Sequence, residues 1–251
     1  MLRRLPGLVL GCGFLVAVAG PVWAAHPLAT EDTGTQGRGH VEVEIGAQRV
    51  RTEAARLVEL GLQATYGVTA AFDVLVRPVV LDVSRVGETT PARTRGAGDT
   101  DIGFKWRFSE ADAGSVALRA DLLLPTGDAG RGLGGGGAAT RLVLIGSMDH
   151  GPWALHGNVG VLRVRPGSDT RRHQAFASTA LVWSPREVLH ISVELIASAE
   201  ADRARRGWPL SSRFGAIVDV TPAIRLDAGL EQRLGAGSAQ SIVLAGMTIL
   251  W

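Results

Sequence analysis

Apolar and polar residues alternate one by one in many short segments of this chain. Residues 40–48 read H-V-E-V-E-I-G-A-Q, and residues 101–108 read D-I-G-F-K-W-R-F. In both, apolar side chains occupy every second position, with polar residues or glycine between most of them. A β-strand has this period, because its successive side chains point to opposite faces. The pattern therefore predicts strands with one apolar and one polar face.

About twelve such segments of roughly ten residues follow one another along residues 40–251, and their connections alternate in length. Short turns are expected near 67–71, 109–114, 149–152, 184–187 and 220–223, and longer Gly-, Arg-, Asp- and Pro-rich loops near 83–98, 125–138, 165–172 and 199–210. Bacterial outer-membrane barrels have short periplasmic turns, long extracellular loops and an even number of strands. We therefore predict an all-β fold, a single antiparallel transmembrane β-barrel of about twelve strands.

The chain ends on an apolar, uncharged stretch, residues 241–251, whose last residue is Trp251. An open sheet edge in lipid leaves backbone groups unpaired at several kcal/mol each, so a barrel needs a last strand that closes it. Bacterial outer-membrane barrels typically end on a Phe or Trp that the barrel-assembly machinery reads. We therefore expect this machinery and outer-membrane lipid as partners. The alternative is the final strand of a soluble β-sandwich.

The aromatic residues help to separate these two alternatives. Six of them fall beside the expected short turns, where they predict an interfacial girdle: Tyr66, Phe72, Phe108, Trp153, Trp183 and Trp251. A soluble sandwich has no physical reason to collect its aromatic side chains at one end, so their placement favours the membrane barrel.

The first 24 residues have the features of a secretory signal peptide. Two arginines precede a largely apolar run, and Val22-Trp23-Ala24 fits a cleavage site after Ala24. The run is shorter than the ~20 residues of a membrane helix, which disfavours an anchor. Cys12 vaguely resembles a lipoprotein box, but a cut so early would leave only a stub of the apolar region. Residues 25–39 are polar and without periodicity, and we expect them to form a periplasmic segment.

Composition agrees with an exported barrel in the bacterial outer membrane. The chain has 33 glycines and 46% hydrophobic residues, dispersed as alternate positions would require. Its net charge of +2 suggests neither a nucleic acid nor an acidic partner. With Cys12 removed, no cysteine remains to form a disulfide, so stability must come from packing or from the membrane.

The polar face of the strands is rich in charge and is the candidate pore lining. Its members are Glu42, Glu44, Glu59, Asp73, Arg77, Asp101, Lys105, Arg107, Arg119, Asp121, Arg141, His156, Glu194, Asp219, Arg225, Asp227, Glu231 and Arg233. These side chains can line a polar pore whose mixed charge selects what passes. They can also pair across the lumen and fill a narrow barrel.

Catalytic and metal-binding chemistry is weakly indicated. His190-Ile-Ser192 has the His-x-Ser spacing of the outer-membrane phospholipase, whose third member is an asparagine, and Asn158 is the sole asparagine here. The apolar neighbours of His190 and Ser192 turn both side chains into the lumen, away from lipid. The glycine-rich stretch 130–137 lacks the Lys-Ser/Thr of a phosphate-binding loop, and the histidines show no metal-ligand spacing. We therefore expect no enzyme, cofactor or metal.

Three stretches resemble a known family: residues 26–35 (HPLATEDTGT), 98–107 (GDTDIGFKWR) and 122–128 (LLLPTGD). Together they are similar to the transporters grouped with the outer-membrane protein of the phenol-degradation meta-pathway, over most of the mature chain. The resemblance implies an outer-membrane barrel that takes up small organic molecules, including hydrophobic or aromatic ones. The resemblance assigns no functional residue to this chain. Two alternatives remain: a closed structural or ligand-binding barrel without flux, and the less favoured lipid hydrolase.

Overall fold

The computed structural model describes residues 27–53, 55–85, 93–165, 170–235 and 240–251. The expected signal peptide, residues 1–24, lies outside these described residues. Among the described residues, no helix is long and apolar enough to cross a membrane. The one helical element there is a short 3-10 turn, η1 (Ala129–Arg131).

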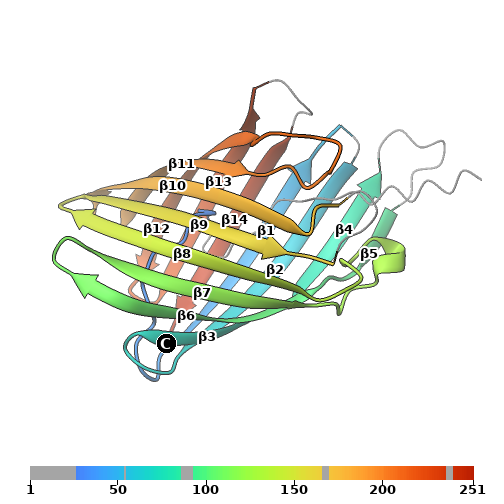
Figure 1. The fold of residues 1–251 in the computed structure, drawn as a ribbon. Coiled ribbons are helices and arrows are strands. Elements are labelled where there is room, and N and C mark those ends of the chain that lie inside the picture. Colours follow the sequence, from blue (N-terminus) through green and yellow to red (C-terminus); the bar gives the residue numbers. More distant parts are fainter. Residues whose placement is uncertain (1–26, 54, 86–92, 166–169, 236–239) are drawn as a thin grey trace, which may run out of the picture.

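The described residues otherwise form strands. They are β1 (Val41–Arg51), β2 (Ala55–Gly67), β3 (Phe72–Arg77), β4 (Val79–Arg85), β5 (Arg93–Ala97), β6 (Thr100–Ala111), β7 (Gly114–Leu124), β8 (Ala139–His150), β9 (Trp153–Arg163), β10 (His173–Arg186), β11 (Leu189–Ser198), β12 (Leu210–Thr221), β13 (Ile224–Leu234) and β14 (Ser241–Leu250). Every strand pairs antiparallel with its neighbours, and β1 pairs with both β2 and β14, so the sheet closes on itself (Figure 1). The all-β antiparallel barrel is thereby confirmed.

Fourteen labelled strands make twelve strands of barrel wall, because two pairs are continuous. β3 and β4 both pair with β2 in one register and are separated only by Pro78, which has no N–H to donate to the ladder. The Pro78 carbonyl still accepts a hydrogen bond from the Leu62 amide at 3.2 Å. β5 and β6 are likewise separated by Gly98 and Asp99, where the register shifts by one residue.

Asp99 at this register shift also holds the loop that follows β7. Its two carboxylate oxygens accept hydrogen bonds from the amides of Gly127, at 2.9 Å, and Gly135, at 2.7 Å. Residues 98–107 and 122–128, two of the stretches on which the family resemblance rests, are therefore in contact. The glycine-rich stretch 130–137 is part of this anchored loop.

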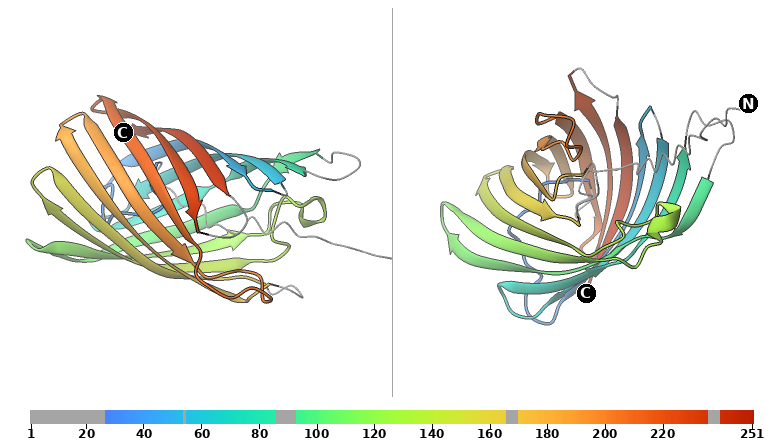
Figure 2. Two further views of the ribbon diagram at one scale, coloured as in Figure 1. Left: turned by 90° about the horizontal axis from the view of Figure 1, so that it is seen from above. Right: turned by 45° about the vertical axis from the view of Figure 1, so that its right-hand side comes forward.

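The connections divide the barrel into two ends. At the short-turn end the chain turns at 68–71, 112–113, 151–152, 187–188 and 222–223. The longer connections lie at the opposite, long-loop end (Figures 1 and 2). β1 begins at the short-turn end, where the Trp251 amide donates to the Val41 carbonyl at 2.9 Å and completes the closure.

The two faces of the wall differ as the alternation requires. Apolar side chains project from the outer face, and Leu60, Leu144 and Leu230 are each about half exposed. Polar and charged side chains point into the lumen and are buried there. Some inward positions are apolar, including the cluster of Val50, Leu57, Ile242 and Leu244 near the long-loop end. The lumen is therefore partly filled by apolar packing as well as by charge.

A charge placed on the outer face should disturb insertion in a depth-dependent way. Ala228 lies near the middle of β13 and Gln232 near its long-loop end, and both side chains are exposed on the outer face. An arginine at the bilayer midplane costs about 2–4 kcal/mol and near the interface about 0–1 kcal/mol. We expect Ala228→Arg to lower the yield and stability of barrel refolded into liposomes, and Gln232→Arg to refold nearly as wild type. Equal defects would contradict this assignment of the β13 faces.

Candidate functional site

The lumen brings together most of the charged residues that the alternation placed on the polar face. Eleven of them are buried on the lumen face of the wall: Glu44, Glu59, Asp73, Arg77, Asp101, Arg119, Asp121, Arg141, Glu194, Asp227 and Glu231. Glu42, Lys105, Arg107, His156, Asp219 and Arg233 are partly exposed on the same face, and Arg225 is exposed near the short-turn end. Their role as a pore lining stays a prediction.

One ion-pair network runs along the inner face of the wall, from β2 to β8. Arg119 lies at its centre, completely buried, and its guanidinium contacts the carboxylates of Asp121, at 3.0 Å, and Glu31. Arg141 binds the other oxygen of Asp121 at 2.9 Å. Arg77 extends the network to Glu59 and Asp101. Buried charges persist only when they are paired and hydrogen-bonded, and here each arginine has acidic partners.

A second cluster surrounds Arg213 on β12. Its guanidinium lies 2.6 Å from a carboxylate oxygen of Glu231 and 3.7 Å from one of Glu194, and it also donates to the Pro27 carbonyl at 3.3 Å. Arg213 was not among the candidate lining residues. The alternation that places Phe214 on the outer face assigns Arg213 to the lumen, so the signal was present in the sequence.

The N-terminal segment, defined here as residues 27–36, runs inside the lumen. Figure 2 shows this blue stretch of chain enclosed by the barrel wall. The prediction of a periplasmic segment over residues 25–39 did not say whether this segment enters the barrel, and residues 27–36 lie inside it. Wall side chains supply the hydrogen-bond acceptors that an extended chain without a neighbouring strand needs.

Besides Arg213, four wall residues bind the backbone of this segment. Glu194 accepts the amides of Ala29, at 3.0 Å, and Thr30, and Asn158 both accepts the Glu31 amide at 2.7 Å and donates to the Glu31 carbonyl at 2.9 Å. Further along, the Ser147 hydroxyl accepts the Thr33 amide at 3.0 Å and the Asp73 carboxylate accepts the Gln36 amide at 3.0 Å. The segment is therefore bound along its length, by one residue after another.

Side chains of the segment also enter the wall's own networks. Glu31 pairs with Arg119 and lies 3.9 Å from the Lys105 ammonium, and Asp32 lies at the same distance from Lys105. Leu28 packs with Ala180 and Val182. These contacts could not be predicted from the sequence, because a segment without periodicity carries no sign of which surface it will meet.

Gly160 shows how tightly the wall is packed beside the segment. The ring of Phe176, which packs with Ala29, lies across Gly160 so closely that a Cβ there would be 2.0 Å from it. Glycine is required at this position because the inward-pointing ring occupies the place of a side chain.

The residues of the candidate hydrolase triad are not joined to one another. His190 is hydrogen-bonded to Ser184 at 2.8 Å and to Asp219 at 3.3 Å. Asn158 is engaged with Glu31, and the Ser192 hydroxyl has no hydrogen-bond partner among the described residues. In the same part of the chain, His, Cys, Asp and Glu side chains form no group of three or more that could hold a metal ion.

The six aromatic side chains of the predicted girdle lie at the short-turn end. Tyr66, Phe108, Trp153, Trp183 and Trp251 are exposed there. The rings of Trp153 and Trp183 stack across neighbouring strands with centroids 5.8 Å apart, and that of Phe72 stacks on Phe104 at 5.4 Å. Contact with a membrane interface stays a prediction for these residues.

A closed antiparallel barrel with an apolar outer face and a polar lumen defines a protein of the bacterial outer-membrane type. The chain belongs to the family described as "Putative MetA-pathway of phenol degradation", whose model matches residues 24–236. The family resemblance of the three sequence stretches is thereby confirmed. Comparison with curated proteins gives no match.

Solved structures of similar fold include an outer membrane channel, a porin and a hydrocarbon channel. An outer membrane channel from Pseudomonas putida F1 is 15% identical and has a TM-score of 0.74, over 89% of this chain and 100% of its own. The NanC porin is 9% identical with a TM-score of 0.56, over 82% and 98%. The CymD monoaromatic hydrocarbon channel is 8% identical with a TM-score of 0.54, over 86% and 89%. At these identities the likeness establishes the fold.

The buried network should contribute strongly to stability. Asp121, with a fully buried side chain, lies between Arg119 and Arg141. Removing one partner of a buried pair typically costs about 3–5 kcal/mol, whereas an exposed pair contributes about 0–1 kcal/mol. We expect Asp121→Asn to lower the urea midpoint of the refolded barrel markedly. Asp219→Asn, which removes a carboxylate from a pair with the half-exposed Arg225, should lower it little. Equal shifts would contradict a stabilising role for the network.

Proposed function

We propose that this protein is a channel of the bacterial outer membrane that passes small organic solutes, with hydrophobic or aromatic molecules as the preferred class. The observation that carries this proposal is the polar, charged lumen inside a wall whose outer face is apolar. Such a lumen offers solutes a route that lipid does not. The family assignment supports the choice of solute, as does the shared fold of CymD, a monoaromatic hydrocarbon channel.

Passage through this lumen depends on the N-terminal segment. Backbone amides of the segment donate hydrogen bonds to Glu194, Asn158, Ser147 and Asp73, and no covalent bond links the segment to these wall residues. Each such bond contributes about 0.5–1.5 kcal/mol net, or about 1.5–3 kcal/mol where the acceptor is the carboxylate of Glu194 or Asp73, since water replaces it on release. Residues 27–36 can therefore act as a gate that leaves its site while the wall stays intact.

The second candidate is a closed structural or ligand-binding barrel without flux. It is favoured by the same segment, because its side chains pair with Arg119 and Lys105 and fill the space between the walls. The two candidates differ in one property, which is whether the segment moves under conditions in which the protein is folded.

Location is the first test of the proposal. With a signal peptide cleaved after Ala24, mature protein should begin at Ala25 and be recovered in outer-membrane fractions. A folded barrel resists detergent until it is heated, so its gel mobility should shift on boiling. Recovery as a soluble periplasmic protein without detergent would contradict the membrane assignment.

The gate is tested by tethering the segment to the wall. The hydroxyls of Thr30 and Ser178 are 2.8 Å apart, and the expected mature chain has no cysteine of its own. We expect the double variant Thr30→Cys, Ser178→Cys to show low single-channel conductance in planar bilayers when oxidised. Reduction should raise the conductance to the wild-type level, because the segment is freed.

Two controls complete this experiment. The single variant Thr30→Cys should not respond to reductant, and thiol labelling should verify that the disulfide of the double variant has formed. Conductance that is the same with the disulfide closed and open would refute the gate. No conductance from correctly refolded wild type would instead support the closed barrel.

A further inference from the structure

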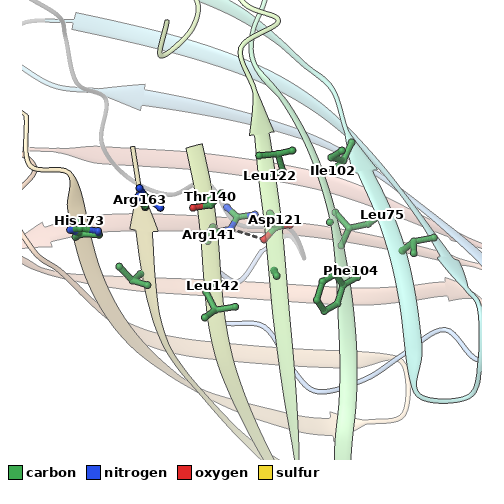
Figure 3. A pocket seen from close by; sticks show the side chains of 14 residues that line it. Leu75, Ile102, Phe104, Asp121, Leu122, Thr140, Arg141, Leu142, Arg163 and His173 are labelled. Atoms are coloured by element: carbon green, nitrogen blue, oxygen red, sulfur yellow. Dashed lines mark hydrogen bonds and ion pairs between the residues drawn. The ribbon is translucent and has the colours of Figure 1, made fainter. Parts of the chain in front are cut away.

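The outer face of the barrel carries a hollow apart from the gate. Its volume is about 860 Å³, and it extends over β3 and β6 to β10 (Figure 3). Leu75, Asp121 and Arg141, which are buried toward the lumen, also line it. The side chains that project into it from the outer face are apolar: Val74, Ile102, Phe104, Leu122, Leu142 and Val161. In the membrane this hollow faces acyl chains.

The long-loop end of the hollow is closed by polar and basic side chains. Arg163 on β9 pairs in register with His173 on β10 on one side and with Thr140 on β8 on the other, and all three are exposed on the outer face. Figure 3 shows Thr140, Arg163 and His173 side by side on these three neighbouring strands. Directly opposed residues on paired strands have Cβ atoms about 4.5–5.5 Å apart, so one small anionic group can contact Arg163 and His173 together.

A second hollow, of about 490 Å³, adjoins the first because His173 lines both. Its lining is mostly basic and includes Arg203, Arg205 and Arg206 from the loop between β11 and β12, together with the exposed Trp208. Its one acidic residue, Glu200, is paired with Arg233 at 2.8 Å. Arg171 fixes this loop by donating to the carbonyls of Arg203, at 3.2 Å, and Arg205, at 2.9 Å. The basic side chains are thus presented by an anchored loop.

Most of these cations lack an acidic partner within the described ranges. Arg205 lies 3.9 Å from Asp202, but the described residues supply no carboxylate to Arg163, Arg203 or Arg206. The arginines of the lumen behave differently, since Arg77, Arg119 and Arg213 are all paired. The positive charge of Arg163, His173 and the arginines of 203–206, called here the outer rim, is therefore available to an external anion.

We propose that this rim binds a phosphorylated, acylated glycolipid of the outer leaflet, with its phosphates on Arg163, His173 and the arginines of 203–206 and an acyl chain in the apolar hollow. Basic clusters at a membrane surface attract anionic lipid head groups, and arginine binds phosphate with two parallel hydrogen bonds. An apolar hollow that is continuous with a basic one fits an amphiphile. A free phosphate would use only the basic hollow, and an apolar solute would use only the apolar one. The proposal rests on the proposed function only for placement in the outer membrane.

Lipid binding can be measured on the refolded barrel in detergent by native mass spectrometry. The probes are diphosphoryl lipid A, phosphatidylethanolamine as a zwitterionic lipid, and inorganic phosphate. For the double variant Arg163→Ala, His173→Ala, we expect the Kd for lipid A to rise about tenfold or more, as the loss of a charge-assisted hydrogen bond implies. The charge-retaining variant Arg163→Lys, His173→Lys should keep most of the affinity.

The matched control is Arg186→Ala, which removes an exposed arginine from the opposite, short-turn end of β10. It should bind lipid A as wild type does. Unchanged affinity in the double alanine variant, an equal loss in Arg186→Ala, or equal binding of phosphatidylethanolamine would overturn the proposal. Binding of inorganic phosphate as tight as that of lipid A would also overturn it.

Gel mobility and conductance of the same preparations keep this inference separate from the channel. A barrel that conducts but does not discriminate lipid A contradicts the lipid site alone. A barrel that binds lipid A through Arg163 and His173 but never conducts contradicts the channel alone.

Discussion

Every other feature of this structure depends on the need to pair backbone N–H and C=O groups inside a membrane. Lipid offers these groups no partner, so a sheet that crosses it must have no free edge. The antiparallel pairing of β1 with β14 meets that requirement, and the bonds between Val41 and Trp251 complete it at the short-turn end. Where the wall contains Pro78, which cannot donate, the ladder is interrupted but the register to β2 is kept.

Closure turns the usual distribution of residues inside out. Because alternate side chains must face lipid, polar residues are confined to a narrow interior and have to find partners there. Arg119, Arg141 and Asp121 solve this by sharing one carboxylate between two guanidinium groups. A solute path through this interior can open only where a part can leave without stranding a buried charge.

In the proposed gate the N-terminal segment is such a part, because Arg119 keeps Asp121 as a partner when Glu31 leaves with the segment. Residues 27–36 also take no part in the backbone ladder of the wall. Function and stability are thus divided between two kinds of contact. The ladder and the wall-to-wall ion pairs hold the barrel, while side chains such as Asn158 and Glu194 hold the segment. The outer rim around Arg163 adds a third kind, directed at the surrounding membrane.

The sequence by itself determined the barrel, a wall of about twelve strands, the alternation of short and long connections and the faces of most strands. These properties are local, because a period of two and a run of turn residues can be read within ten positions. The long loop expected near 83–98 was wrong in extent, because β4 continues to Arg85 and β5 spans Arg93–Ala97. The sequence did not determine which charges meet. Arg119 contacts Glu31, 88 residues away, and Arg213 contacts Pro27, 186 residues away, through the closure of the sheet. The position of residues 27–36 was decided by the same closure, since their contact surface exists only once the wall has formed.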